Sequence, residues 1–170
     1  MLAGGRVSPE LSRMRAIAEE YCRLIEGLEH RPADWLERLN TLLPRLHAAV
    51  ASLAVSRGDG HHYLEPNLDA RFELYTRLRK LLGDRDSYWM EFDGTGEEHC
   101  KSGSLADDLT DIYCELKYGL TLLDTQPEAP DDAFEGWRTG YRVHWGQHLV
   151  DAERHLYSLQ SRNKLRERRS

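Results

Sequence analysis

The sequence predicts an all-α fold, a single-domain bundle of about five helices that spans residues 1–170. Apolar residues recur at three- and four-residue steps along most of the chain, which is the spacing of one helix face. Only six prolines interrupt the chain, and 40% apolar with 31% charged residues is the composition of a globular domain. We expect one core, a flexible N-terminus (1–7) and a solvated basic C-terminal tail (162–170).

The first two helices have clear sequence signals. Ser8 precedes Pro9, the usual order of an N-cap and a first helical residue, and the apolar face that follows covers residues 11–28. A second apolar face covers residues 35–53. Pro44 lies inside this second pattern. Because proline lacks a backbone donor and crowds the preceding turn, we expect a kink or a short break there.

The third helix and the segment after it rest on shorter signals. Asn67 is a suitable N-cap and Gly83 a suitable C-terminal stop. The apolar face between them consists of Leu68, Phe72, Tyr75, Leu78 and Leu82. Residues 88–92 are too few to classify, and we expect an extended piece laid over the bundle. A glycine-rich, acidic loop up to Gly103 should follow it.

The last two helices are the longest. Ser104 and Asp107 resemble a capping box, and the apolar stripe of the fourth helix continues to Leu123. The fifth helical stretch covers about residues 131–162. Its glycines favour a break near residues 136–140, because each costs roughly 1 kcal/mol inside a helix.

The charge distribution argues against two classes of partner. Residues 91–135 hold thirteen acidic and two basic residues, within a net charge of −6 for the chain. An acidic middle repels phosphate backbones, so we expect no nucleic-acid binding, and no apolar run approaches the length of a membrane span. Three scattered cysteines and an N-terminus unlike a signal peptide lead us to expect a cytoplasmic protein.

The fourth helix carries the acidic candidates for a metal site: Asp107, Asp108, Asp111 and Glu115. Carboxylates three and four residues apart share a helix flank and can hold a cation together. At about 100° per residue, Asp108 and Glu115 flank the apolar stripe, whereas Asp107 and Asp111 point more toward solvent. Helix capping explains Asp107 better than metal binding does.

The fifth helical stretch carries His144 and His148, four residues apart and therefore on one face. Zinc proteases with this spacing place a glutamate after the first histidine, whereas this chain has Trp145, so that mechanism is not supported. If the two helices are antiparallel neighbours, Asp108 or Glu115 faces His144 or His148. These four residues would then hold a divalent metal or form a structural polar network, and the sequence leaves both open.

Segments of both helices resemble a known family. The runs at residues 104–113, 116–120 and 144–148 are similar to a bacterial family of uncharacterised all-helical proteins, classed only as a domain of unknown function. Tyr21 and residues 39–46 are similar to it as well. The resemblance covers most of the chain and implies an all-helical domain. It implies no activity, cofactor or partner.

The sequence favours a non-catalytic helical domain that binds a protein partner or forms a homo-oligomer. Support for this comes from aromatic residues beyond core needs, namely Tyr88, Trp89 and Phe92. The alternative is a divalent-metal-dependent hydrolase acting on a small phosphate or amide, with the ion held by the Asp108, Glu115, His144 and His148 cluster. A third hypothesis is a small-molecule pocket lined by Tyr113, Trp137, Tyr141 and Trp145, although such aromatics are more often core residues.

Overall fold

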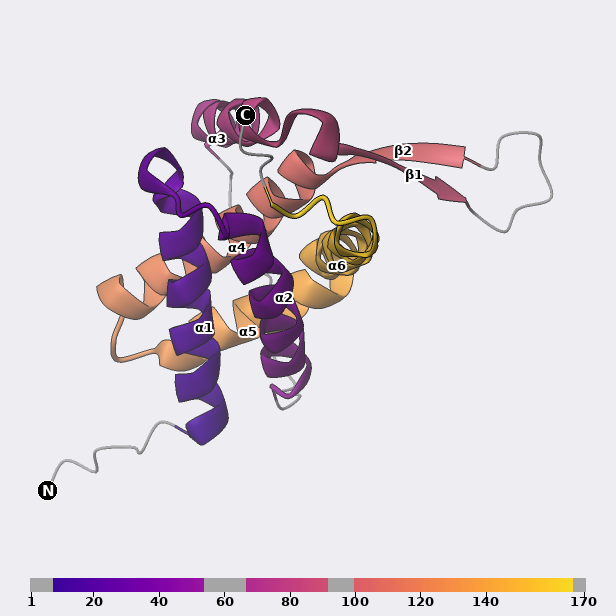
Figure 1. Ribbon diagram of the computed structural model, residues 1–170. Helices are drawn as coiled ribbons and strands as arrows, with labels where there is room; N and C mark the ends of the chain where they lie inside the picture. The colour runs from indigo at the N-terminus through magenta and orange to yellow at the C-terminus, as the bar shows by residue number, and fades with distance from the viewer. Residues whose placement is uncertain (1–7, 54–66, 92–99, 167–170) are drawn as a thin grey trace, which may run out of the picture.

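A computed structural model describes residues 8–53, 67–91 and 100–166 (Figure 1). Its helices are α1 (Pro9–Glu26), α2 (Trp35–Ala51), α3 (Leu68–Leu82), α4 (Leu105–Thr125), α5 (Pro130–Gly140) and α6 (Gly146–Ser161). A π-helical turn, Tyr141–Trp145, joins α5 directly to α6. The described residues thus form five helical segments around one core, and the predicted all-α fold is confirmed. None of these helices combines the length and the apolar character needed to cross a membrane.

Local sequence sets the helix ends. The Ser8 hydroxyl accepts a hydrogen bond from the Leu11 amide at 3.3 Å, and the Asn67 side chain accepts one from the Ala70 amide at 3.1 Å. Both predicted N-caps are therefore confirmed. Gly83 ends α3 with φ of 53°, a left-handed conformation that favours glycine.

Helix α4 is the central element of the bundle. It packs against α1, α3, α5 and α6. Because neighbours cover it on several sides, polar residues of α4 are buried as well, including Asp108, Thr110 and Asp111. A Cβ at Gly119 would lie 2.2 Å from the Trp137 indole, so glycine is what allows α5 to approach α4 this closely.

A short hairpin leaves the helices on one side (Figure 1). Strand β1 (Ser87–Glu91) pairs antiparallel with β2 (Cys100–Ser104). Tyr88 is buried against the helices, whereas Trp89 is 73% exposed, as the alternation of a strand requires. The extended piece predicted after α3 is therefore present. The glycine-rich loop was expected to continue to Gly103, and this is wrong for its last residues, because residues 100–104 form β2.

The short break considered at Pro44 and most of the apolar face predicted for α3 are not found. Helix α2 continues through Pro44 without a break, since the residues on both sides are held in the core. The predicted apolar face of α3 is buried only at Leu78 and Leu82, whereas Leu68 and Phe72 are exposed. The side chain that joins the first half of α3 to α4 is instead Arg71, which pairs with carboxylates of α4.

In the described part of the basic tail, residues 162–164 and 166 are exposed, and two contacts tie the tail to the bundle. Leu165 is buried in the core, and Arg166 forms an ion pair with Glu37 of α2 at 2.8 Å. The chain reverses at Asn163, which has φ of 55°. Residues 1–7 and 167–170, the remainder of the segments expected to be flexible, lie outside the described residues.

Candidate metal centre

The two histidines of the fifth helical segment lie where its backbone changes form. His144 belongs to the π-helical turn and His148 to the first turn of α6. A Cβ at Gly146, where the two meet, would lie 2.2 Å from the Tyr141 carbonyl oxygen, so glycine permits this tight geometry. The imidazole centroids are 5.2 Å apart. Single π-helical turns inside α-helices occur frequently at functional sites.

His148 lies between two carboxylates of α4. Its Nδ1 is 2.8 Å from Asp108 Oδ1, and its Nε2 is 3.2 Å from Asp111 Oδ2. Burial opposes protonation of His148, but the hydrogen bond to Asp108 and the charges of Asp111 and Asp108 outweigh it and raise the pKa of His148 above 6.5. Burial also raises the pKa of the Asp108 carboxyl, although hydrogen bonds from His148 and Tyr88 act in the opposite direction.

His144 has a carboxylate partner of its own. Its Nδ1 is 3.1 Å from Glu115 Oε1. A Cβ at Gly140 would lie 2.9 Å from Glu115 Oε2, so the glycine leaves room for this carboxylate. A carboxylate that accepts from Nδ1–H fixes the tautomer, leaving Nε2 of a neutral imidazole as the lone-pair donor. Asp108 acts on His148 in the same way.

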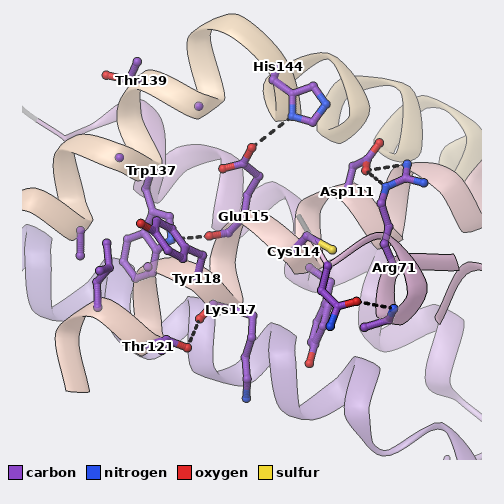
Figure 2. Close-up of a pocket in the computed structure, with 18 of the residues that line it drawn as sticks. Arg71, Asp111, Cys114, Glu115, Lys117, Tyr118, Thr121, Trp137, Thr139 and His144 are labelled. Atoms are coloured by element: carbon purple, nitrogen blue, oxygen red, sulfur yellow. Dashed lines mark hydrogen bonds and ion pairs between the residues drawn. The ribbon is translucent and has the colours of Figure 1, made fainter. Parts of the chain in front are cut away.

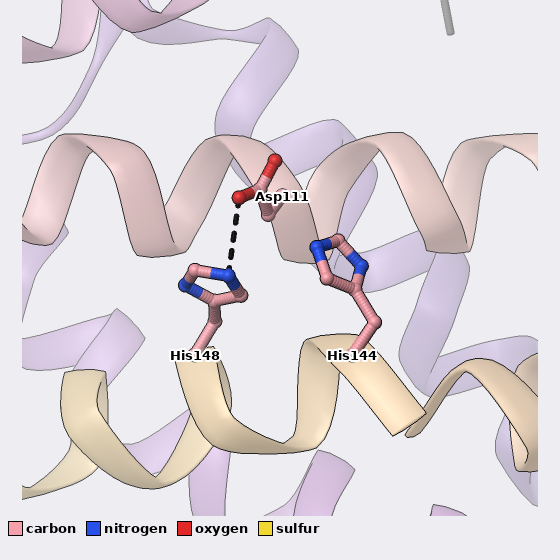
Figure 3. A group of neighbouring side chains, drawn as sticks. All are labelled: Asp111, His144 and His148. Atoms are coloured by element: carbon pink, nitrogen blue, oxygen red, sulfur yellow. Dashed lines mark ion pairs between the residues drawn. The ribbon is translucent and has the colours of Figure 1, made fainter. Parts of the chain in front are cut away.

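Three side chains converge on one point between α4 and α6. Asp111, His144 and His148 each offer one ligand atom, and these atoms lie within 4.8 Å of one another (Figure 3). Figure 3 shows both imidazoles reaching from one helical segment toward Asp111 on the other. Asp108 and Glu115 stand behind the two rings, which is where metal sites place the carboxylates that orient their histidines.

The donor set matches a transition metal such as Zn²⁺. With Zn–ligand bonds of about 2.0–2.1 Å, tetrahedral donor atoms are about 3.3 Å apart, so the three side chains must move closer by up to about 1.5 Å. The His144 side chain is 49% exposed and is therefore free to make most of this adjustment. Two imidazoles with one carboxylate suit zinc or iron better than magnesium or calcium.

Arg71 completes the surroundings of Asp111. Its Nε donates to Asp111 Oδ1 at 2.7 Å, and its terminal nitrogen donates to Asp107 Oδ1 at 2.9 Å. Asp111 Oδ2, which faces His148, is thereby left to bind a metal ion. The guanidinium also offsets part of the negative charge that α4 gathers here.

The hairpin fixes Asp108 from the other side. The Tyr88 hydroxyl donates to Asp108 Oδ2 at 2.5 Å. Burial and the hydrogen bond to Asp108 both raise the pKa of Tyr88, so the phenol remains a proton donor. The Tyr88 ring packs 4.7 Å from the His155 ring, whose Nε2–H donates to the Arg85 carbonyl at 2.7 Å. Asp108 is thus held by both α6 and β1.

A cavity of about 700 Å³ adjoins these residues between α3, α4 and α5 (Figure 2). Asp111, Glu115 and His144 line one end of it, together with Arg71. The remaining wall is largely apolar or aromatic and includes Leu74, Tyr113, Tyr118, Leu122, Trp137 and Val143. The Trp137 indole donates to the Glu115 carbonyl at 3.1 Å, which fixes this part of the wall. The candidate metal centre is therefore open to a ligand-sized space.

The sequence left open whether the two helices are neighbours; in the structure they are, and Asp108, Glu115, His144 and His148 lie together. They form two pairs, Asp108 with His148 and Glu115 with His144. The prediction that Asp111 points toward solvent is wrong, because α3 and α6 cover the flank that a single-stripe helical wheel assigns to water. Its position three residues after Asp108 and four before Glu115 was the sequence signal for it.

Other predictions are confirmed in part. The Ser104 hydroxyl accepts from the Asp107 amide at 3.3 Å, as in a capping box, but the Asp107 carboxylate pairs with Arg71. Of the four aromatic residues predicted for a pocket, Tyr113 and Trp137 line the cavity. No pattern in the sequence links Arg71 or Tyr88 to this site, since both come from elements distant along the chain.

The fold and the site define an all-α, single-domain bundle with a three-donor cluster at the end of a cavity. The chain belongs to the family described as "Domain of unknown function (DUF5063)", whose model matches residues 6–162. Among solved structures it is similar to the crystal structure of protein BF1032 from Bacteroides fragilis, a Northeast Structural Genomics Consortium target. That match has a TM-score of 0.74 and 21% identity over 90% of this chain and 93% of the other, and it shows the fold alone. A comparison with curated proteins finds no match.

Proposed function

We propose that this protein is a divalent-metal-dependent hydrolase whose ion is held by Asp111, His144 and His148. The observation that carries the proposal is the convergence of these three donor atoms within 4.8 Å, beside a cavity that Asp111 and His144 also line. Hydrolytic zinc sites use three protein ligands of this kind and leave a fourth position for water. Zn²⁺ is therefore the ion we expect.

Each surrounding residue then has a chemical role. A zinc ion held by these three residues would lower the pKa of a bound water to about 7 and would so supply hydroxide at neutral pH. Asp108 and Glu115 hold His148 and His144 in the tautomer that binds through Nε2.

Metal binding by untagged protein tests the proposal. Zinc content measured by mass spectrometry and Zn²⁺ titration by calorimetry should give one ion per chain. Asp111→Asn and His148→Gln should each weaken binding at least about 100-fold, since each removes one of three ligands. His30→Gln, an exposed histidine outside the cluster, is the matched control and should bind normally. Equal affinity in all four proteins would contradict the proposal.

Association with a partner protein or with itself is a second candidate function. It is supported by Trp89 and Tyr157, which are 73% and 71% exposed. Tyr88 does not contribute to such a surface because it is buried, and Phe92 lies outside the described residues. Light scattering over a range of concentrations tests self-association. A strict monomer that captures no partner in a pull-down would count against this function.

The described cysteines support a cytoplasmic location. Cys22 and Cys114 are free thiols. Burial raises the pKa of Cys22 to about 12, so it remains a protonated, unreactive thiol. Free, unreactive thiols are typical of proteins in a reducing compartment.

A further inference from the structure

We infer that the cavity beside the candidate metal centre takes a neutral acyl compound with an apolar tail, an ester or an amide rather than a phosphate. The position of the acyl group, at the candidate metal centre, rests on the proposed function. The position of the apolar tail rests on the cavity alone.

The cavity wall selects for an apolar tail. Away from its polar end, the space of about 700 Å³ is bounded mainly by the side chains of Leu74, Tyr113, Tyr118, Leu122, Trp137 and Val143. Apolar ligand groups that enter such a space gain affinity with each methylene they bury. The Trp137 indole behind this wall is held by its hydrogen bond to the Glu115 carbonyl, so this part of the wall is fixed before a ligand binds.

The charge at the polar end selects for a neutral reacting group. Asp111 and Glu115 line this end of the cavity and Asp107 and Asp108 lie beside them, so with the Arg71 guanidinium the formal charge is −3 while the imidazoles are neutral. Lys117, the other cation of the cavity wall, is paired with Glu26 at 2.6 Å, and this ion pair adds no net charge. A divalent ion reduces the formal charge to −1. A phosphate monoester would add about two further negative charges, and like charges at this distance repel. An ester or amide adds none.

Arg71 does not reverse this preference. Its guanidinium is engaged by Asp111 at 2.7 Å and by Asp107 at 2.9 Å, so its charge is already matched by two carboxylates. A phosphate-binding arginine needs its fork free for the ligand oxygens. The acyl carbonyl oxygen, in contrast, needs only the ion.

The reaction follows from this placement. An ion held by Asp111, His144 and His148 would supply hydroxide from a bound water, and the proton of that water would pass to solvent. The hydroxide oxygen would form a bond to the acyl carbon, the bond from that carbon to nitrogen or oxygen would break, and the departing amine or alcohol would take a proton from solvent. The products are a carboxylic acid and an amine or alcohol.

One position on α5 allows the cavity to be filled without disturbing its walls. A Cβ at Gly136 has no atom within 4 Å, and the residue lines the cavity. The leucine side chain of the Gly136→Leu variant would therefore fill the part of the cavity that we assign to the tail, and the substitution also raises helix propensity. Ala51→Leu, which adds a larger side chain at an exposed helix end outside the cavity, is the matched control.

The test compares three chromogenic substrates on zinc-loaded protein: p-nitrophenyl acetate, p-nitrophenyl octanoate and p-nitrophenyl phosphate. We expect kcat/KM for the octanoate to exceed that for the acetate at least about 30-fold, because the longer tail is buried in the cavity. Gly136→Leu should remove this gain while keeping Zn²⁺ affinity, whereas Ala51→Leu should change nothing. Asp111→Asn gives the background rate. Preferred hydrolysis of the phosphate, or equal rates for both esters, overturns the inference.

Binding to metal-free protein separates this inference from the proposed function. The neutral fluorophore N-phenylnaphthylamine should bind the metal-free protein, be displaced by octanamide but not by acetamide, and fail to bind Gly136→Leu. If this holds while Zn²⁺ does not bind, the proposed function fails and the apolar tail site stands. If Zn²⁺ binds but Gly136→Leu leaves fluorophore binding unchanged, the tail site is wrong.

Discussion

Replacing Asp108 by asparagine should weaken Zn²⁺ binding although Asp108 itself is not one of the three converging ligands. Asp108 Oδ1 lies 2.8 Å from Nδ1 of His148, and both side chains are largely buried. Asparagine keeps an oxygen that accepts from Nδ1–H and removes the negative charge. The variant therefore isolates the electrostatic contribution of a carboxylate behind a metal-binding histidine.

The expected loss of Zn²⁺ affinity follows from the distance between the ion and the Asp108 carboxylate. An ion bound at Nε2 of His148 would lie about 7 Å from the Asp108 carboxylate, and with an effective dielectric constant of about 20 their attraction is at most about 5 kcal/mol. The difference in Zn²⁺ affinity between wild type and Asp108→Asn should be smaller than this limit for two reasons. The asparagine side chain keeps a dipole that attracts the ion, and burial raises the pKa of the Asp108 carboxyl, so charging it in the wild type has a cost. We expect an affinity loss of about 10- to 100-fold, the range for removal of such an orienting partner.

Calorimetric titration of Zn²⁺ into the metal-free protein measures this loss directly. Asp132→Asn makes the same charge change at an exposed position on α5 and should leave the affinity within a factor of about two. Circular dichroism confirms that both variants are folded. Unchanged or tighter Zn²⁺ binding in Asp108→Asn would refute the assignment of His148 as a ligand oriented by this carboxylate.

Three further predictions concern packing, a buried hydrogen bond and pH. Gly119→Ala places a Cβ 2.2 Å from the Trp137 indole and should destabilise the fold by about 1–3 kcal/mol in urea denaturation; unchanged stability would contradict the close approach of α4 and α5. Tyr21→Phe removes a fully buried hydroxyl that donates to the Leu109 carbonyl at 2.8 Å and should cost about 1–2 kcal/mol in the same assay, whereas a neutral effect would contradict the hydrogen bond. Because the folded pKa of His148 is raised above 6.5, its protonated form stabilises the metal-free protein below pH 6.5, and this stability is lost as the pH rises through the folded pKa. Thermal melts of wild type and His148→Gln across this range should converge at higher pH, and a constant difference would contradict the shift.

Much of the fold could be predicted from the sequence because local signals agree with one another. Ser8 and Asn67 cap the helices that they were expected to cap, and the apolar spacing of the long helices matches their buried faces. The failures are at places where tertiary contacts override local preference. Pro44 does not break α2, because the surrounding leucines are held in the core.

The candidate site could be predicted only in part. The spacing of His144 and His148, and of the acids on α4, identified one face of each helix, but it left open whether the two helices are neighbours. A helical wheel with one apolar stripe could not identify Asp111, because α4 is covered on several sides and its buried arc is wider than one stripe. Arg71 and Tyr88 reach the site from α3 and β1, and only the three-dimensional structure brings them there.

Anomalous diffraction at the zinc absorption edge, on crystals of the untagged protein grown with Zn²⁺, would show whether Asp111, His144 and His148 hold an ion. We expect a single strong peak between α4 and α6, about 2.0–2.1 Å from a carboxylate oxygen of Asp111 and from one nitrogen each of His144 and His148. A map without a peak at that point, with His148 still bridging Asp108 and Asp111, would contradict this expectation.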